Sequence, residues 1–231
     1  MPNSPQRCCN MRVGCLELRL QKFMRPLVMK ILSSFVLSLA LISTAGIASA
    51  AGDAQAGKAT AATCMGCHGA PGLRNAYPAF RVPKLGGQQE QYLIVALKAY
   101  QSGERSHPTM QAQAGSMSDT EINNVAAYFS GLAGPDAVEL GDGDANAGAA
   151  KAQACFACHG AGGKKPIAPM YPSLAGQYPD YLSHALADYK SGARNNAIMK
   201  GFAAALSKQD MEDIAAYFGS QASSLSTPTN W

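Results

Sequence analysis

Two stretches of this sequence decide its fold: Cys64-Met65-Gly66-Cys67-His68 and Cys155-Phe156-Ala157-Cys158-His159. Positions i, i+3 and i+4 of a helix share one face, so each stretch presents two thiols and one imidazole together. This C-x-x-C-H spacing is typical of c-type haem attachment, in which both thiols bond to one haem and the imidazole binds its iron. The sequence therefore predicts two covalently bound haem c groups.

Two alternatives to haem exist for such cysteines. A C-x-x-C pair can form a redox-active disulfide, and it can also supply half of a zinc site. Zinc would need further Cys or His ligands grouped nearby. Because there are two matches, each preceded by related sequence, the pattern favours haem over both alternatives.

The chain contains an internal repeat. The segment 52–57 (GDAQAG) returns as 143–148 (GDANAG), 91 residues later, whereas 83–88 (PKLGGQ) returns as 172–177 (PSLAGQ), 89 residues later. The loop after each haem motif therefore differs by two residues, which a surface loop tolerates. We predict a signal peptide and N-terminal extension at 1–50, a first domain at 51–134, a linker at 135–142, a second domain at 143–219 and a flexible tail at 220–231.

The sequence pattern within each repeat is helical. A first helix leads into the haem motif, and a second is expected at about 88–101 or 177–190. Ser118 and Glu121 form a capping box for a third helix with an apolar stripe, and Ser207 with Asp210 offers a weaker version of the same cap. No alternating strand pattern competes, so the expected fold class is all-α, with two tandem domains wrapped around one haem each. Such small domains have modest cores, so haem should supply much of the interior.

The repeat also selects the second axial ligand of each iron. Met110 stands eight residues before Ser118, and Met199 stands eight residues before Ser207. Because a ligand required twice should occur at equivalent positions, we predict that His68 and Met110 bind one iron and that His159 and Met199 bind the other. Met117, Met170 and Met211 have no methionine at the equivalent repeat position and are interpreted as ordinary apolar packing. Met65 lies inside the attachment motif and cannot reach the far face of the haem.

Two histidines lie outside the motifs, and neither has a histidine at the equivalent repeat position. His107 is the rival to Met110 as an axial ligand and is otherwise interpreted as a loop residue. His184 falls off the apolar stripe of its helix and is expected to face solvent. The open coordination site that a di-haem peroxidase would need finds no support in either repeat.

Residues 1–50 resemble an export signal. An apolar run from Ile31 to about Ile42 precedes Ala48-Ser49-Ala50, which matches the A-x-A pattern of a secretory cleavage site. The run is shorter than the ~20 apolar residues of a membrane span, which argues against a retained anchor. We expect cleavage after Ala50 and a periplasmic product, with Met24 or Met29 as alternative starts.

The basic charge of the chain belongs to this leader. Six of the 19 Lys and Arg residues precede residue 31, and from Ala51 onward 13 basic face 14 acidic side chains, a formal charge of −1. A nucleic-acid partner is therefore not expected.

From these residues the chain resembles the di-haem cytochromes c of the cytochrome c4 type, which consist of two class I cytochrome c domains. The resemblance covers residues 51–231 and rests on the paired haem motifs, the segments 83–88 and 172–177 and the paired methionines. It implies that a proline carbonyl holds each haem-binding imidazole, with Pro83 and Pro172 in those roles. Such a bond orients the ligand.

The resemblance also implies the function. It predicts an electron carrier rather than an enzyme, with redox proteins as partners: a quinol-oxidising cytochrome complex or a dehydrogenase as donor and a terminal oxidase as acceptor. The alternative is the cytochrome subunit of a periplasmic dehydrogenase, and peripheral membrane association stays open. The loop cations Arg74, Arg81, Lys84, Lys164 and Lys165 are interpreted as solvated charges that could shape docking.

Overall fold

The computed structural model describes residues 52–134, 136–222 and 225–229. The predicted leader and the expected cleavage site after Ala50 lie outside these ranges. No helix within them is long and apolar enough to cross a membrane.

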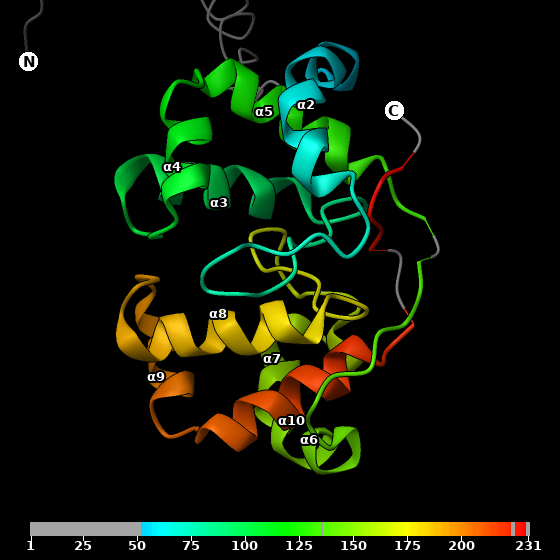
Figure 1. Ribbon diagram of the computed structural model, residues 1–231, viewed down its shortest axis with the longest axis vertical. Helices are drawn as coiled ribbons and strands as arrows, with labels where there is room; N and C mark the ends of the chain where they lie inside the picture. Colours follow the sequence, from blue (N-terminus) through cyan, green and yellow to red (C-terminus); the bar gives the residue numbers. More distant parts are fainter. Residues whose placement is uncertain (1–51, 135, 223–224, 230–231) are drawn as a thin grey trace, which may run out of the picture. The chain divides into compact units, whose positions relative to one another are not determined.

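The regular structure of the described chain is helical, and its extended pairs are isolated bridges. The first half contains α2 (Ala54–His68), α3 (Glu90–Ser102), α4 (Pro108–Gly115) and α5 (Asp119–Ser130). The second half contains α6 (Ala145–Lys151), η1 (Ala152–Cys155), α7 (Phe156–His159), η2 (Ala161–Gly163), α8 (Pro179–Ser191), α9 (Ala197–Ala204) and α10 (Lys208–Gly219). Figure 1 shows two groups of helices, α2–α5 and α6–α10, with the long loops after α2 and α7 between them. The predicted all-α fold class is confirmed.

The first and last helices of each half cross at a glycine. A Cβ on Gly57 would lie 2.0 Å from the carbonyl oxygen of Asn124, and one on Gly148 would lie 2.0 Å from that of Asp213. Only glycine permits this approach, because any larger residue would force the two backbones apart. The contact brings α2 onto α5 and α6 onto α10, so each haem motif is anchored on the last helix of its own half.

Both closing helices begin at the predicted caps. Ser118 accepts the N–H of Glu121 at 3.3 Å, and the Glu121 carboxylate accepts the N–H of Ser118 at 2.8 Å. Ser207 and Asp210 form the same reciprocal pair, at 3.1 and 2.9 Å, so the second capping box is complete rather than weaker. The apolar stripes behind these caps supply much of each core, through Val125 and Phe129 or Ile214 and Phe218, for example.

Both halves contain a short helix, α4 or α9, that the sequence analysis did not predict. The helices expected at 88–101 and 177–190 are α3 and α8, shifted by one or two residues, and each ends at a glycine with positive φ. After them come α4 and α9, which carry Met110 and Met199. Both helices are only eight residues long, and each has a single buried residue, Ala114 or Ala203. The sequence of α4 has almost no apolar stripe, whereas α9 contains Ile198, Met199 and Phe202, so a helix there could have been predicted.

Loop residues join the two halves. The backbone N–H of Lys84 donates to Gln177 at 2.9 Å, and the Gln177 amide donates back to the carbonyl oxygen of Lys84 at 2.9 Å. Gln88, the repeat equivalent of Gln177, likewise donates to the carbonyl oxygen of Ser173 at 3.0 Å and accepts its N–H at 2.9 Å. The glutamine that ends each repeat segment thus forms a reciprocal contact with the opposite half.

The interpretation of Arg81 and Lys84 as solvated charges was wrong. Arg81 donates through Nε to Asp180 at 3.0 Å. Lys84 is 2% exposed, lies 3.4 Å from Asp136 and sits 4.8 Å from the centre of the Tyr178 ring. Both cations therefore belong to the contact between the halves, whereas Lys164 and Lys165 are exposed.

The C-terminal segment differs from the flexible tail that was expected. Gly86 and Ser226 exchange two backbone hydrogen bonds, at 3.0 and 2.9 Å. Leu225 is 1% exposed. The described residues 225–229 therefore return to the loop after the first haem motif.

Candidate haem sites

Each haem motif lies where a helix reaches a large cavity. Cys64, Cys67 and His68 occupy the last turns of α2, and their counterparts lie in η1 and α7. The motif cysteines and histidines of both halves line one continuous cavity, and all four thiols are free. Burial raises the pKa of the Cys64 and Cys155 thiols, so both are neutral near pH 7. This argues against a redox thiolate in either motif, because such thiols have lowered pKa values.

The two imidazoles are oriented in the same way. Nδ1 of His68 lies 2.9 Å from the carbonyl oxygen of Pro83, and Nδ1 of His159 lies 2.9 Å from that of Pro172. The carbonyl can only accept, so Nδ1 carries the proton and Nε2 keeps its lone pair. Burial lowers the pKa of both rings, although the proline carbonyls act in the opposite direction. A neutral, oriented imidazole is what an iron ligand must be.

Met110 and Met199 line the same cavity as the two histidines. Each is the third residue of a short helix, and its backbone N–H donates to the side chain of the residue that caps that helix. The cap of α4 is His107, whose Nδ1 accepts at 3.3 Å, and the cap of α9 is Asn196, whose Oδ1 accepts at 3.0 Å. His107 is thus a helix cap rather than the loop residue that we expected.

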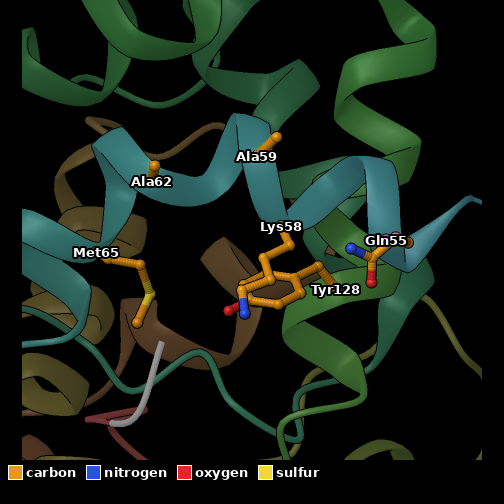
Figure 2. A pocket seen from close by; sticks show the side chains of 6 residues that line it. All are labelled: Gln55, Lys58, Ala59, Ala62, Met65 and Tyr128. Atoms are coloured by element: carbon orange, nitrogen blue, oxygen red, sulfur yellow. The ribbon is translucent and has the colours of Figure 1, made fainter.

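The other methionines take different positions. Met65 is 2% exposed and points into the hollow between α2 and α5 that Figure 2 shows, where Lys58 and Tyr128 also lie. Met117 packs against the first core and Met211 is buried in the second half. Met170 is 52% exposed and lines the cavity.

A cluster of arginine and tyrosine side chains in the cavity was missed by the sequence analysis. Arg105 and Arg194 are 8% and 5% exposed. The guanidinium of Arg105 donates to the Tyr92 hydroxyl at 3.2 Å, and that of Arg194 donates to the Tyr181 hydroxyl at 3.0 Å. All four residues obey the 89-residue repeat, so the argument that selected the methionines could have found them.

The cluster is electrostatically unbalanced. Among the described residues no carboxylate lies within ion-pairing distance of Arg105 or Arg194. Burial opposes ionisation of Tyr92, but the charges of Arg105 and Arg194 lower its pKa to about 8. The Asp188 carboxylate acts on Arg194 only from beyond ion-pairing distance. Two buried cations without an ion-pair partner are costly unless an anionic group joins them. The two carboxylates that each haem carries would supply that charge, so this cluster fits the cofactor.

The prediction for His184 was wrong. Its ring stacks on that of Phe80 at a centroid distance of 4.1 Å, and its Nε2 lies 3.3 Å from Asp188. Phe80 comes from the loop after α2, so His184 contributes to the contact between the halves instead of facing solvent.

The donor set does not suit zinc. Within the part of the chain that the structure describes, no group of three or more Cys, His, Asp or Glu side chains could hold a metal ion. Each half instead brings one histidine, one methionine and two thiols to the cavity. This is the set of groups that binds a covalent haem with histidine and methionine as iron ligands.

Comparison with known proteins agrees with this geometry. The cytochrome c family model matches residues 54–133 and 145–222. Cytochrome c4 from Pseudomonas aeruginosa is 38% identical over 200 residues, which are 81% of this chain and 96% of that protein. A thiosulfate dehydrogenase electron acceptor from Stutzerimonas stutzeri is 33% identical over 172 residues, which are 68% of this chain and 78% of that protein.

Solved structures show the same likeness. Reduced recombinant cytochrome c4 from Pseudomonas stutzeri aligns with a TM-score of 0.60 at 31% identity, covering 74% of this chain and 100% of that chain. Each region that the family model matches contains one C-x-x-C-H motif, so the protein carries two covalently bound haem c groups and is an electron carrier. The chain therefore belongs to the cytochrome c family, as a di-haem protein of the cytochrome c4 type.

Proposed function

We propose that this chain shuttles electrons between respiratory-chain partners in the periplasm and donates them to a terminal oxidase. In this proposal the first haem is held by Cys64, Cys67, His68 and Met110, and the second by Cys155, Cys158, His159 and Met199. The domains that hold them extend over 51–134 and 143–219.

One observation carries the proposal: in both halves the motif histidine and the repeat-matched methionine line the same cavity, and each histidine has its Nδ1 bonded to a proline carbonyl. If the histidine and the methionine both bind the iron, no coordination position would remain for a substrate. His/Met ligation favours the reduced state and raises the potential, which suits delivery of electrons to an oxidase.

The cofactor supplies one-electron chemistry, and the chain supplies its environment. Leu93, Val125 and Phe129 in the first half, and Leu182, Ile214 and Phe218 in the second, form apolar cavity walls that exclude water. The Pro83 and Pro172 carbonyls hold the imidazoles, and the Arg–Tyr cluster offers positive charge to carboxylates.

The donor is a quinol-oxidising cytochrome complex or a dehydrogenase. The second possibility has specific support, because a relative is described as a thiosulfate dehydrogenase electron acceptor. Encounters between redox proteins use small, short-lived interfaces, so either donor would bind weakly. The near-neutral charge from Ala51 onward supports protein partners of this kind rather than a polyanion.

The test is a pair of rapid-mixing experiments on the haem-loaded protein. The reduced protein is mixed with membranes that contain a terminal oxidase, and the oxidised protein with thiosulfate and a thiosulfate dehydrogenase. Oxidation of both haems by the oxidase, at a rate sufficient for respiration, is expected. Failure of the oxidase reaction, together with rapid reduction by the dehydrogenase, would favour a dedicated dehydrogenase partner over the respiratory shuttle.

A further inference from the structure

The two methionine-bearing helices bury little of their surface against the rest of the protein. An eight-residue helix is too short to be stable alone. Against the rest of the protein α4 buries only Ala114 and α9 only Ala203, and Ile198 and Phe202 of α9 line the cavity. Polar contacts at the ends of these helices therefore help to fix the positions of Met110 and Met199.

The C-terminal ends are held from the preceding long helix. Gln101 donates to the carbonyl oxygens of Ala114 and Met117 at 2.8 and 2.7 Å. Lys190, the repeat equivalent of Gln101, donates to the carbonyl oxygen of Leu206 at 2.6 Å. These contacts lie more than one helical turn beyond the methionines and do not reach their backbone.

The N-terminal ends are held at the methionines themselves. The first N–H groups of a helix have no acceptor within the helix. In both halves the cap side chain accepts the N–H of the methionine: His107 for Met110 and Asn196 for Met199. The caps have nearly the same backbone angles, φ −156° and ψ 106° against φ −155° and ψ 112°. Two chemically different side chains thus do one task at equivalent positions.

We propose that His107 and Asn196 are positioning residues, each holding the backbone of its methionine so that the thioether can bind iron. Methionine has three rotatable side-chain bonds, so its sulfur is placed only if its backbone is fixed. The ring of His107 is itself held, with edge contacts to Phe80 at 6.3 Å and Tyr100 at 6.5 Å. Under this assignment His107 is not an iron ligand. The inference rests on the proposed Met110 and Met199 ligation.

The experiment measures how readily added imidazole displaces each thioether from ferric iron. It uses the haem-loaded protein and follows the near-infrared methionine-to-iron band. In a Met199→Ala background the remaining band reports on the first haem alone, and in a Met110→Ala background it reports on the second. The variants are His107→Ala, His107→Asn and the matched Asn196→Ala.

His107→Ala should tighten the apparent affinity for imidazole at the first haem about fivefold, the factor that corresponds to a cap bond of ~1 kcal/mol. Asn196→Ala should do the same at the second haem. His107→Asn should keep the parent affinity, since asparagine already performs this task in the other half. A merely structural role elsewhere would not be rescued by asparagine.

Two results would overturn the inference: unchanged imidazole affinity in both alanine variants, or a loss in His107→Asn equal to that in His107→Ala. Absence of the near-infrared band from the parent proteins is a different outcome. It would refute methionine ligation, and with it the proposed function, before any cap variant was made. A first-haem spectrum that loses a histidine ligand in His107→Ala would show that His107 binds iron and would likewise overturn the assignment.

Discussion

Arg105 and Arg194 place two positive charges in the cavity, and no carboxylate of the described residues pairs with them. Each guanidinium instead lies near two tyrosine rings, at 5.3 and 5.6 Å for Arg105 and 5.6 and 5.2 Å for Arg194. These cation–π contacts partly offset the free-energy cost of removing the cations from water, but they do not neutralise the charge. A ferric haem has one more positive charge than a ferrous one, so a nearby cation favours the ferrous state.

Replacing Arg105 by Gln should therefore lower the reduction potential of the first haem. The charge is desolvated, and water screens it little. Spectroelectrochemical titration of the haem-loaded protein measures the shift. Lys164→Gln removes one charge from an exposed side chain and should shift the potential less. Equal shifts in the two variants would show that Arg105 acts only through the net charge of the protein.

The methionine assignment is also tested one residue at a time. Met110→Ala should abolish about half of the near-infrared methionine-to-iron band, and Met199→Ala the other half. Each change should lower the potential of its own haem, because the thioether favours ferrous iron. Near-infrared absorption and a redox titration check both effects.

Met117→Ala is the control for this pair. Met117 packs against the first core, so its truncation should reduce stability, by up to the ~2–5 kcal/mol typical of buried methionine, and leave the band intact. A full band in Met110→Ala, together with a changed first-haem spectrum in His107→Ala, would make the first site bis-histidine.

At the scale of helices, both halves contain the same contact between the segment before the first helix and the last helix, but different side chains stabilise it. Asn124 in α5 accepts the N–H of Asp53 at 2.8 Å, and Asp213 in α10 accepts the N–H of Asp144 at 2.9 Å. In the second half Lys151 adds an ion pair to Asp213 at 2.6 Å. Thr60 stands at the equivalent of Lys151, so the first half has no such pair.

This difference predicts a pH dependence for the second half. Hydrogen bonding from Lys151, then from Gln209 and the Asp144 backbone, lowers the pKa of Asp213. A carboxyl whose folded pKa is below its unfolded value of ~3.9 stabilises the fold above that value. The contribution is lost as the pH falls through the lowered folded pKa.

Asp213→Asn should therefore reduce the free energy of unfolding at pH 7, and the difference from the parent should shrink below pH ~4. Asparagine can still accept the Asp144 N–H, as it does in the first half, so the variant isolates the charge. Denaturant unfolding at the two pH values measures the effect. Asn124→Asp is the matched control and should add no stability, because Thr60 offers no cation; a pH-independent loss in Asp213→Asn would contradict the ion-pair account.

The sequence predicts a helix well when the residues that stabilise its start lie close together in the chain. The capping boxes at Ser118 and Ser207 are complete within four residues, and they were found. α4 has neither an apolar stripe nor a Ser, Thr, Asp or Asn cap, because His107 takes that place, so it was missed. Asn196 is a normal cap residue, and the repeat could have linked it to His107.

At the scale of the whole chain, the errors concern charges whose partners are distant. Arg81 binds Asp180, 99 residues away, and Lys84 bonds to Ala137, 53 residues away. Neither partner can be read from the neighbouring sequence, so both cations resembled loop charges. The repeat did predict two similar halves, but it gave no sign that Gln88 and Gln177 would hold them together.

The leader affects the whole molecule through charge and location. If cleavage follows Ala48-Ser49-Ala50, the mature chain begins Ala51-Gly52-Asp53 and loses every basic residue before position 31. Mass spectrometry of protein purified from the periplasm should show this N-terminus. A mature product that retains the apolar run from Ile31 would refute both the localisation and the neutral-charge argument.

The cofactor content follows from all four cysteines of the described chain together. If each forms a thioether, haem cannot be extracted without breaking covalent bonds. Denatured protein should keep two haems per chain through acid-acetone extraction, and alkylating reagent should find no thiol in the mature chain. Haem quantification against protein mass, with mass spectrometry of haem peptides, checks both numbers.

Variants that remove one motif extend this test to the fold. Cys64→Ala with Cys67→Ala should yield one haem per chain and a destabilised first half, because the cavity walls there would lose the apolar face that they enclose. The matched Cys155→Ala with Cys158→Ala should do the same to the second half. Because reciprocal loop hydrogen bonds join the halves, each variant should also weaken the other half, seen as a lower midpoint for the remaining haem domain in thermal unfolding. Two independent transitions, with the intact half unchanged, would show that the loop contacts between the halves transmit no stability.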